Sequence, residues 1–311
     1  MLNRRHLRIR VLQFVYSCNR TKDMDISKIE KEFLKSLDKV EELYIYLLLF
    51  IVELRDYAEN FQENAKSKRM PSEEDLNPNT KFTDNLYIDK LKEESNLIEI
   101  ANHKKLSFAN QKSIIRSIYL RLKESPLFLE YISLNTTDFE DDKKFVLKLF
   151  SKYIIDSEEF QYFLNEQNIF WDDDLPFISS MVAKTIKDST SQQISLFNLF
   201  KNKEDKQFAI DLLRHSIIHH DEFSEMIANK TTNWEIERVA QMDLILMHMT
   251  LAELLKMPHV PVKVSINEYV DLAKYYSTPN SKNFINGILD SILIDLKQKG
   301  LIKKIGRGLI E

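Results

Sequence analysis

The sequence predicts an all-α protein, and two observations lead to this prediction. The chain has 311 residues but only four glycines, and none of them comes before Gly287. Tight hairpin turns depend on residues that accept a positive φ, above all glycine, so a sheet-rich fold is unfavourable here. Apolar residues also recur at helical spacing along most of the chain, with prolines between the periodic segments. We therefore expect a nearly all-helical fold.

The first half of the chain is expected to form helices separated by polar turns. Over 3–18, the apolar residues from Leu7 to Val15 are spaced as a stripe on one helix face. The polar stretch 66–82 contains two prolines and is the best candidate for a linker. The other helices of this half are expected at 24–37, 38–68, 84–101, 109–124, 127–134 and 140–166.

In the second half, capping boxes and prolines set the expected helix ends. Thr-Asn-Trp-Glu at 232–235 and Ser-Ile-Asn-Glu at 265–268 place a hydroxyl three residues before a glutamate, which is typical of a helix start. Pro258 and Pro261 end the helix that begins at the first box. The acidic segment 171–176 is interpreted as a loop that enters a helix, not as a metal site. The helices of this half are then expected at 176–188, 203–228, 232–256, 265–276 and 281–300.

The glycine and cysteine counts exclude several kinds of enzyme. Phosphate-binding loops and the nucleophile elbow need closely spaced glycines, so a P-loop, a Rossmann or methyltransferase cofactor site and a serine hydrolase are all unfavourable. Cys18 is the single cysteine, which excludes an intrachain disulfide and a cysteine-based zinc cluster. We expect no enzyme activity, no cofactor and no metal.

Charge and hydropathy predict a cytoplasmic protein that does not enter a membrane. The most apolar run, 43–52, is far shorter than the roughly 20 residues that span a bilayer. The first residues are basic, but no apolar signal core follows them. The net charge is −4, so any nucleic-acid site has to be a local basic patch.

The best candidate for such a patch is the start of the first helix. Arg4, Arg5 and Arg8 fall within an arc of roughly 100° at helical spacing, while Arg10 points elsewhere. Cations at a helix N-terminus oppose the macrodipole, so local stability does not call for them. Guanidinium groups bind phosphate oxygens in a bidentate manner, and Tyr16 can add a stacking surface. The alternative is a solvated charged terminus.

A second candidate is the polar loop and helix start at 279–287. Asn283 and Asn286 can hydrogen-bond base edges or phosphates. Gly287 inside a helix costs about 1 kcal/mol relative to alanine, which predicts a packing or contact reason. The alternative is a capped helix in which Phe284 belongs to the core and Gly287 permits a close helix crossing.

Two further clusters are weaker candidates. The tail after Leu296 is basic and has no acid before its last residue, which suits nonspecific attraction to phosphates as well as a frayed, solvated end. His215 and His219 have the spacing of helical metal ligands, but no cysteine or His-Glu-x-x-His pattern accompanies them. We interpret them as surface histidines.

Taken together, these segments resemble the NusB family of transcription antitermination factors. The start, from Asn3 through the arginines to Tyr16, is similar to the arginine-rich first helix of that family. The string from Val260 to Glu268, followed by Asp-Leu-Ala-Lys-Tyr at 271–275 and Lys-Asn-Phe-Ile-Asn-Gly-Ile-Leu-Asp at 282–290, is more specific. The resemblance covers about a third of the chain and implies a NusB-like helical bundle enlarged by an inserted helical region.

The resemblance also implies a division of the chain and a function. We expect the first helix at 1–20, a helical insertion of unknown role at 21–200, the rest of the NusB-like bundle at 201–300 and a basic tail at 301–311. The implied ligands are single-stranded boxA RNA and the ribosomal protein NusE, acting with RNA polymerase in antitermination of ribosomal RNA transcription. The implied RNA contacts are Arg4, Arg5, Arg8, Tyr16, Lys282, Asn283, Phe284 and Asn286.

Partner contacts are implied at Glu237 and Asp243, with paired carboxylates at the edge of the core as the alternative. His248 departs from the family, which often has arginine there. Two other functions stay open at this stage: a helical scaffold that binds proteins alone, and an accessory domain of an RNA-modifying system.

Overall fold

The computed structural model describes residues 2–18, 25–134, 138–168, 171–200, 202–231 and 239–309. Within these ranges the chain is helical, with no strand beyond an isolated bridge between Leu2 and Phe200. The all-α prediction is confirmed. The chain divides into two compact units, which we call the split unit (Met1–Lys35 with Phe200–Glu311) and the central unit (Ser36–Leu199). The division of the chain at 20 and 200 into bundle and insertion stays a prediction.

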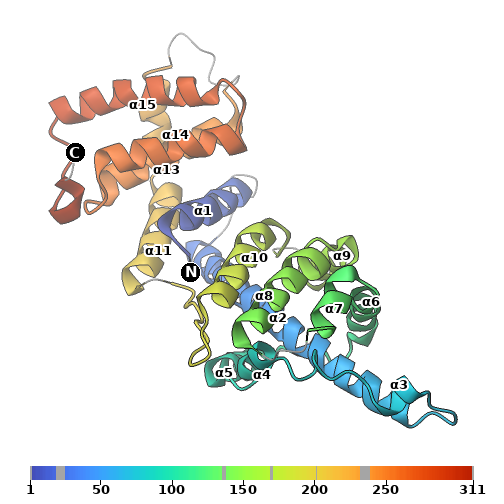
Figure 1. Ribbon diagram of the computed structural model, residues 1–311. Helices are drawn as coiled ribbons and strands as arrows, with labels where there is room; N and C mark the ends of the chain where they lie inside the picture. Colours follow the sequence, from blue (N-terminus) through green and yellow to red (C-terminus); the bar gives the residue numbers. More distant parts are fainter. Residues whose placement is uncertain are drawn as a thin grey trace. The chain divides into compact units, whose positions relative to one another are not determined.

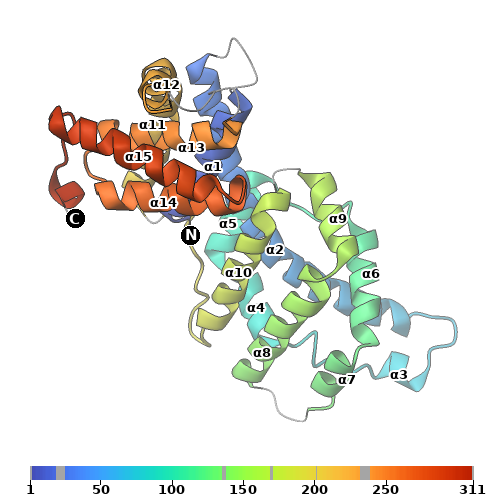
Figure 2. The same ribbon diagram turned by 90° about the horizontal axis from the view of Figure 1, so that it is seen from above.

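The central unit is built around the long helix α2, Ile26–Lys66, whose first residues belong to the split unit (Figures 1 and 2). Aromatic side chains pack on it: Tyr46 lies 4.1 Å from Phe108 and Phe50 lies 4.5 Å from Phe160, measured between ring centroids. The other elements of this unit are α3 Glu73–Leu76, α4 Leu86–Lys92, α5 Ser95–Lys104, α6 Lys112–Lys123, α7 Pro126–Ile132, α8 Phe139–Leu149, the π-helix η1 Phe150–Ile155, α9 Glu158–Gln167 and α10 Trp171–Asp188.

The split unit is organised around α13, Gln241–Lys256, in which every residue from Ile245 to Leu254 is buried. Helices on several sides of α13 explain its nearly uniform apolar sequence. α1 packs on α11 and α13, and α14 packs on both α13 and α15 (Figure 1). The elements that surround α13 are α1 Arg4–Cys18, α11 Lys203–Ile218, α12 His220–Ala228, α14 Val262–Tyr276, α15 Ser281–Gln298 and the 3-10 turn η3 Gly306–Leu309.

Several expected helix boundaries are wrong. α2 runs through residue 38 without a break, because neither glycine nor proline interrupts it there. The expected helix at 84–101 is two helices, α4 and α5, and the one at 140–166 is broken before Ser157, which caps α9 by accepting from the Phe160 amide. The expected helix at 203–228 breaks at His219.

Two expected helix starts are also wrong. α10 begins at Trp171, where a loop was expected, and its three aspartates stand in the first turn, where the macrodipole favours them. α14 begins at Val262, so Ser265 lies inside the helix and is no cap. The expected capping box at 232–235 lies outside the described residues.

Candidate nucleic-acid interface

The four arginines of α1 divide into an outer pair and an inner pair. Arg4 and Arg5 keep about a third of their side-chain surface exposed, whereas Arg8 and Arg10 are buried. Arg4 donates from Nε to Asp205 Oδ1 at 3.1 Å and lies 4.8 Å above the Phe208 ring. These contacts hold the outer guanidinium of Arg4 beside α11 while part of it stays in solvent.

Arg8 forms a bidentate ion pair with Glu253 of α13 inside the split unit. Its Nη2 lies 2.6 Å from Oε1 and its Nε lies 2.9 Å from Oε2, with 3% and 0% of the two side chains exposed. Ser265 and Tyr269 of α14 donate their hydroxyls to the same carboxylate, each at 2.9 Å. A guanidinium enclosed in this way is not offered to a ligand in solution. The structure therefore assigns Arg8 a positioning role in place of the expected RNA contact.

The pKa shifts follow from this burial. Burial lowers the pKa of the Arg8 guanidinium, but the charge and hydrogen bonds of Glu253 outweigh it and raise the pKa above its ordinary value. Burial, followed by the charge of Glu253, raises the pKa of Tyr269 well above its usual range. Tyr269 thus stays protonated and donates to the carboxylate at all ordinary pH values.

A polar cleft of about 510 Å³ lies where α14 meets the first turns of α15. Three of the predicted RNA contacts line it, namely Lys282, Asn283 and Asn286. Arg5 reaches the same place from α1, because its Nη1 lies 3.8 Å from the Oδ2 of Asp271, which also lines the cleft. The consecutive helices α14 and α15 and the distant helix α1 thus bring cations and amides together.

Asp271 is the acid at the centre of this cleft. It pairs with Lys274 on its own helix and with Arg5. The hydrogen bond from Lys274 is the largest cause that holds the pKa of Asp271 below its usual range. Burial opposes it, and the charges of Lys274, Arg5 and Lys282 add to the lowering. Since Asp271 is ionised, it keeps Arg5 at the rim of the cleft.

Gly287 also lines the cleft, and the space around it is open. A Cβ added there would meet no described heavy atom within 4 Å. The alternative in which this glycine permits a close helix crossing is therefore wrong. What the glycine does provide is bare backbone at the wall of the cleft.

The two predicted aromatic contacts are not part of the cleft wall. Tyr16 and Phe284 are both half-buried, and neither lines this cleft. Tyr16 follows Arg4 by twelve residues, which is roughly 18 Å along a helix. Both stay predictions as stacking residues.

Asp243 stabilises the turn before α15. It is buried and accepts hydrogen bonds from Ser277 at 2.5 Å and Ser281 at 2.8 Å. A carboxylate beside the first turn of α15 is favoured by the helix dipole, and Asn280 at the N-cap makes no side-chain cap bond. Glu237, the other expected partner contact, lies outside the described residues.

The histidines form a separate group on α11, α12 and α13. His248 is buried, its Nε2 lies 3.1 Å from the Ser224 hydroxyl, and its ring lies 4.6 Å from that of His220. Burial and the neighbouring His220 lower the pKa of His248 to about 4, so this position carries no charge near neutral pH. Among the described residues, no group of three or more potential metal ligands converges.

The sequence alone assigned no role to Glu253 or Asp271. Arg8 stands four residues before Leu12 and seven before Val15, so helical spacing already places it on the apolar face. The sequence therefore indicated that Arg8 is buried. It did not indicate that the partner of Arg8 is Glu253, which lies 245 positions away.

No helix in the described part of the chain combines the length and apolar character needed to cross a bilayer.

Comparison with known proteins gives one consistent family. The model of the NusB family matches residues 174–293. Three proteins named transcription antitermination protein NusB are similar to this chain: 46% identical over 105 residues in Salinibacter ruber, 42% over 106 residues in Chloroherpeton thalassium and 41% over 95 residues in Geobacter sulfurreducens. The matches cover 34%, 34% and 30% of this chain.

The matched segments span 66%, 50% and 69% of these three relatives, so the chain covers half to about two thirds of their length. No solved structure matches this chain. The family model includes α13, α14 and the part of α15 that borders the cleft, where the expected NusB-like strings lie. The chain belongs to the NusB family.

Proposed function

We propose that this protein is a non-enzymatic transcription antitermination factor that binds single-stranded boxA-type RNA together with the ribosomal protein NusE. The observation that carries the proposal is the cleft at which Arg5, Lys282 and two asparagine amides meet. Cations attract phosphates and amides recognise base edges, which is the chemistry that a single strand of RNA requires. The similarity to proteins named for transcription antitermination supports the same function.

In this proposal the protein forms and breaks no covalent bond. Arg4, Arg5 and Lys282 bind phosphates, and Asn283 and Asn286 bind base edges. Tyr16 and Phe284 offer aromatic surface for unstacked bases. Asp271 holds Arg5 at the rim of the cleft until a phosphate competes for the guanidinium. Arg8 acts through its ion pair with Glu253, which fixes α1 against α13.

The second ligand is NusE, and the residues proposed to contact it include Glu237 and Asp243. Simultaneous binding of RNA and NusE lets two modest affinities multiply, because the second binding event becomes intramolecular. The assembled complex then joins RNA polymerase. This places the protein in the cytoplasm with the transcription machinery.

The test is fluorescence anisotropy with a labelled boxA-like strand and a scrambled strand, with and without NusE. We expect the wild-type protein to prefer the boxA-like strand. The double variant Arg4→Ala/Arg5→Ala should weaken that binding and reduce the salt slope by about 1.4, because each phosphate contact contributes about 0.7 for a single strand. The matched control Lys112→Gln/Lys152→Gln removes two exposed, unpaired charges of the central unit and should change neither quantity.

Equal, weak binding of both strands by the wild-type protein, even with NusE present, would contradict the proposal. The chain would then be a helical scaffold that binds proteins alone.

A further inference from the structure

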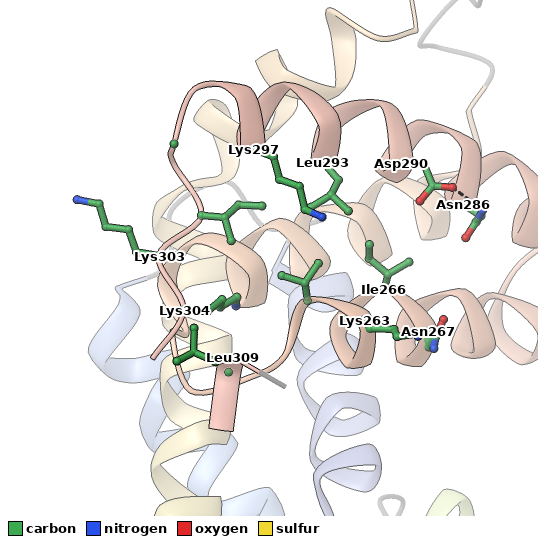
Figure 3. A pocket seen from close by; sticks show the side chains of 14 residues that line it. Lys263, Ile266, Asn267, Asn286, Asp290, Leu293, Lys297, Lys303, Lys304 and Leu309 are labelled. Carbon is green, nitrogen blue, oxygen red and sulfur yellow. Dashed lines mark hydrogen bonds between the residues drawn. The ribbon is translucent and has the colours of Figure 1, made fainter. Parts of the chain in front are cut away.

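A second groove adjoins the cleft and is lined by α14, α15 and the C-terminal segment (Figure 3). Its volume is about 880 Å³. Aliphatic side chains form part of its lining: Ile266, Leu293, Ile302 and Leu309. Asn267 and Asn286 line both this groove and the polar cleft, so the two are adjacent.

The rim of the groove is positively charged. Lys263, Lys297 and Lys303 line it from α14, α15 and the C-terminal segment (Figure 3). All three side chains are exposed, and no carboxylate in the described ranges forms an ion pair with any of them. The acid that lines the groove is Asp290, whose carboxylate accepts from the Asn286 amide at 2.9 Å.

The stability of the helices explains the position of only one of these three lysines. Lys297 stands in the last turn of α15, where the helix dipole favours a cation. Lys263 stands in the first turn of α14, where the dipole opposes a cation, and α14 has no side-chain cap bond to compensate. A cation placed against the dipole at the rim of this groove favours an anionic ligand.

The wall formed by the C-terminal segment is fixed in place. Lys304 donates from Nζ to the carbonyl oxygens of Glu253 at 3.0 Å and Met257 at 3.1 Å, and Ile305 donates its amide to Pro258 at 3.1 Å. Gly308 packs so closely on Pro258 that an added Cβ would lie 2.0 Å from its carbonyl oxygen. The groove is therefore formed before any ligand arrives.

We propose that this groove binds the continuation of the RNA strand that occupies the polar cleft. The inference rests on the proposed function and extends it from one site to a continuous track. Lys263, Lys297 and Lys303 neutralise phosphates along the rim, and bases pack on the aliphatic lining. No aromatic side chain lines this groove among the described residues, so stacking and sequence preference should be weaker here than in the cleft.

The experiment compares three labelled strands: a boxA-like strand of about 12 nucleotides, which is within the range that one binding fold covers, and the same strand extended by about six nucleotides at one end or at the other. Anisotropy titrations at several salt concentrations use the wild-type protein and the variant Lys263→Gln/Lys297→Gln/Lys303→Gln. The matched control is Lys112→Gln/Lys148→Gln/Lys152→Gln, which removes three exposed, unpaired lysines of the central unit. Thermal unfolding verifies that all three proteins are equally folded.

We expect one of the extended strands to bind the wild-type protein about tenfold more tightly than the short strand, with a salt slope larger by about 2, because three phosphate contacts contribute about 0.7 each. The groove variant should lose that gain and bind the short strand normally. The control should keep the gain.

Three outcomes would overturn the inference. If neither extension binds more tightly than the short strand, the track ends at the cleft, while the proposed function stands. If the wild-type protein binds no strand, the proposed function fails as well. If a labelled decaglutamate peptide binds the wild-type protein but not the groove variant, and the extended RNA does not distinguish the two, the groove belongs to an acidic protein segment.

Discussion

The ion pair between Arg8 and Glu253 provides the sharpest test of how burial determines the contribution of an ion pair to the stability of this protein. The variant Arg8→Met keeps an unbranched apolar side chain and removes the guanidinium. It leaves the Glu253 carboxylate, of which 0% is exposed, with two hydroxyl donors and no cation. Removal of one partner from a buried pair costs about 3–5 kcal/mol, because the other charge remains buried and uncompensated. We expect a cost near the lower end, about 3 kcal/mol, since Ser265 and Tyr269 still bind the carboxylate.

The split unit contains its own control. Arg214 of α11 binds Glu30 of α2 with the same bidentate geometry, at 2.7 and 2.9 Å, but 41% and 19% of these side chains are exposed. An exposed pair contributes about 0–1 kcal/mol, so Arg214→Met should cost less than a third of what Arg8→Met costs. The two ion pairs share their bidentate geometry and differ in burial and in the two hydroxyl groups that also bind Glu253.

The measurement is native-state hydrogen exchange of peptides from α1 and α13, which reports the free energy of opening of the split unit separately from the central unit. The double variant Arg8→Met/Glu253→Gln should be more stable than the sum of the single changes predicts, because the buried carboxylate is gone. RNA binding by the folded fraction of Arg8→Met should stay within about twofold of the wild type if Arg8 only positions α1. Equal costs for Arg8→Met and Arg214→Met would refute the reasoning.

The remaining predictions concern three other positions. Gly287→Ala should stabilise α15 by up to about 1 kcal/mol in thermal unfolding, since the space is open, yet weaken RNA binding if the strand approaches that backbone; unchanged affinity would remove Gly287 from the site. The pKa of His248 is lowered to about 4, so between pH 6.5 and pH 4 this histidine is protonated in the unfolded chain but not in the folded protein. The free energy of unfolding should therefore decrease by about 3 kcal/mol as the pH falls from 6.5 to 4. His248→Gln should flatten this part of the urea-unfolding profile, and an unchanged profile would assign the acid sensitivity to other groups. Gly308→Ala should displace the C-terminal segment, because its Cβ would meet the Pro258 carbonyl, and hydrogen exchange of 301–309 should increase; unchanged protection would mean that the backbone yields instead.

Helical periodicity was sufficient for the fold class and for the elements whose ends carry a strong signal. α1 and α15 lie close to their expected spans, and α13 ends at Lys256 as expected, since Pro258, Pro261 and Gly300 mark ends that few other residues produce. The start of α13 was wrong, because the helix begins at Gln241, nine residues after the expected position. Gly300 has a φ of +64°, as expected for the residue after a helix. Some boundary errors fall where helices continue or break without glycine or proline, as at residue 38 in α2 and at His219 between α11 and α12. Others fall beside a proline, because α10 continues through Pro176 and α14 begins directly after Pro261. Tertiary packing determines these helix boundaries, and a single sequence does not reveal tertiary packing.

The candidate site was partly predictable for the same reason. Residue types and local spacing indicated Arg5 and Asn286, the family resemblance implied Lys282, and the structure brings these three to one place. The shared helix face of Arg4, Arg5 and Arg8 did not reveal which edge of that face turns inward. That depends on Glu253, a partner separated by 245 positions, and long-range pairing is invisible to periodicity.

Glu253 joins segments that the ribosome makes at very different times. Its carboxylate binds Arg8 of α1, and its carbonyl oxygen accepts from Lys304 near the end of the chain. At a synthesis rate of roughly 5–20 residues per second, Glu253 follows Arg8 by roughly 10–50 s. Throughout that interval the guanidinium of Arg8 has no carboxylate to enter the core with, and burial of an unpaired charge is costly. We therefore expect the arginine to disfavour early burial of the first helix, and the split unit to close only after residues 36–199 of the central unit have been synthesised.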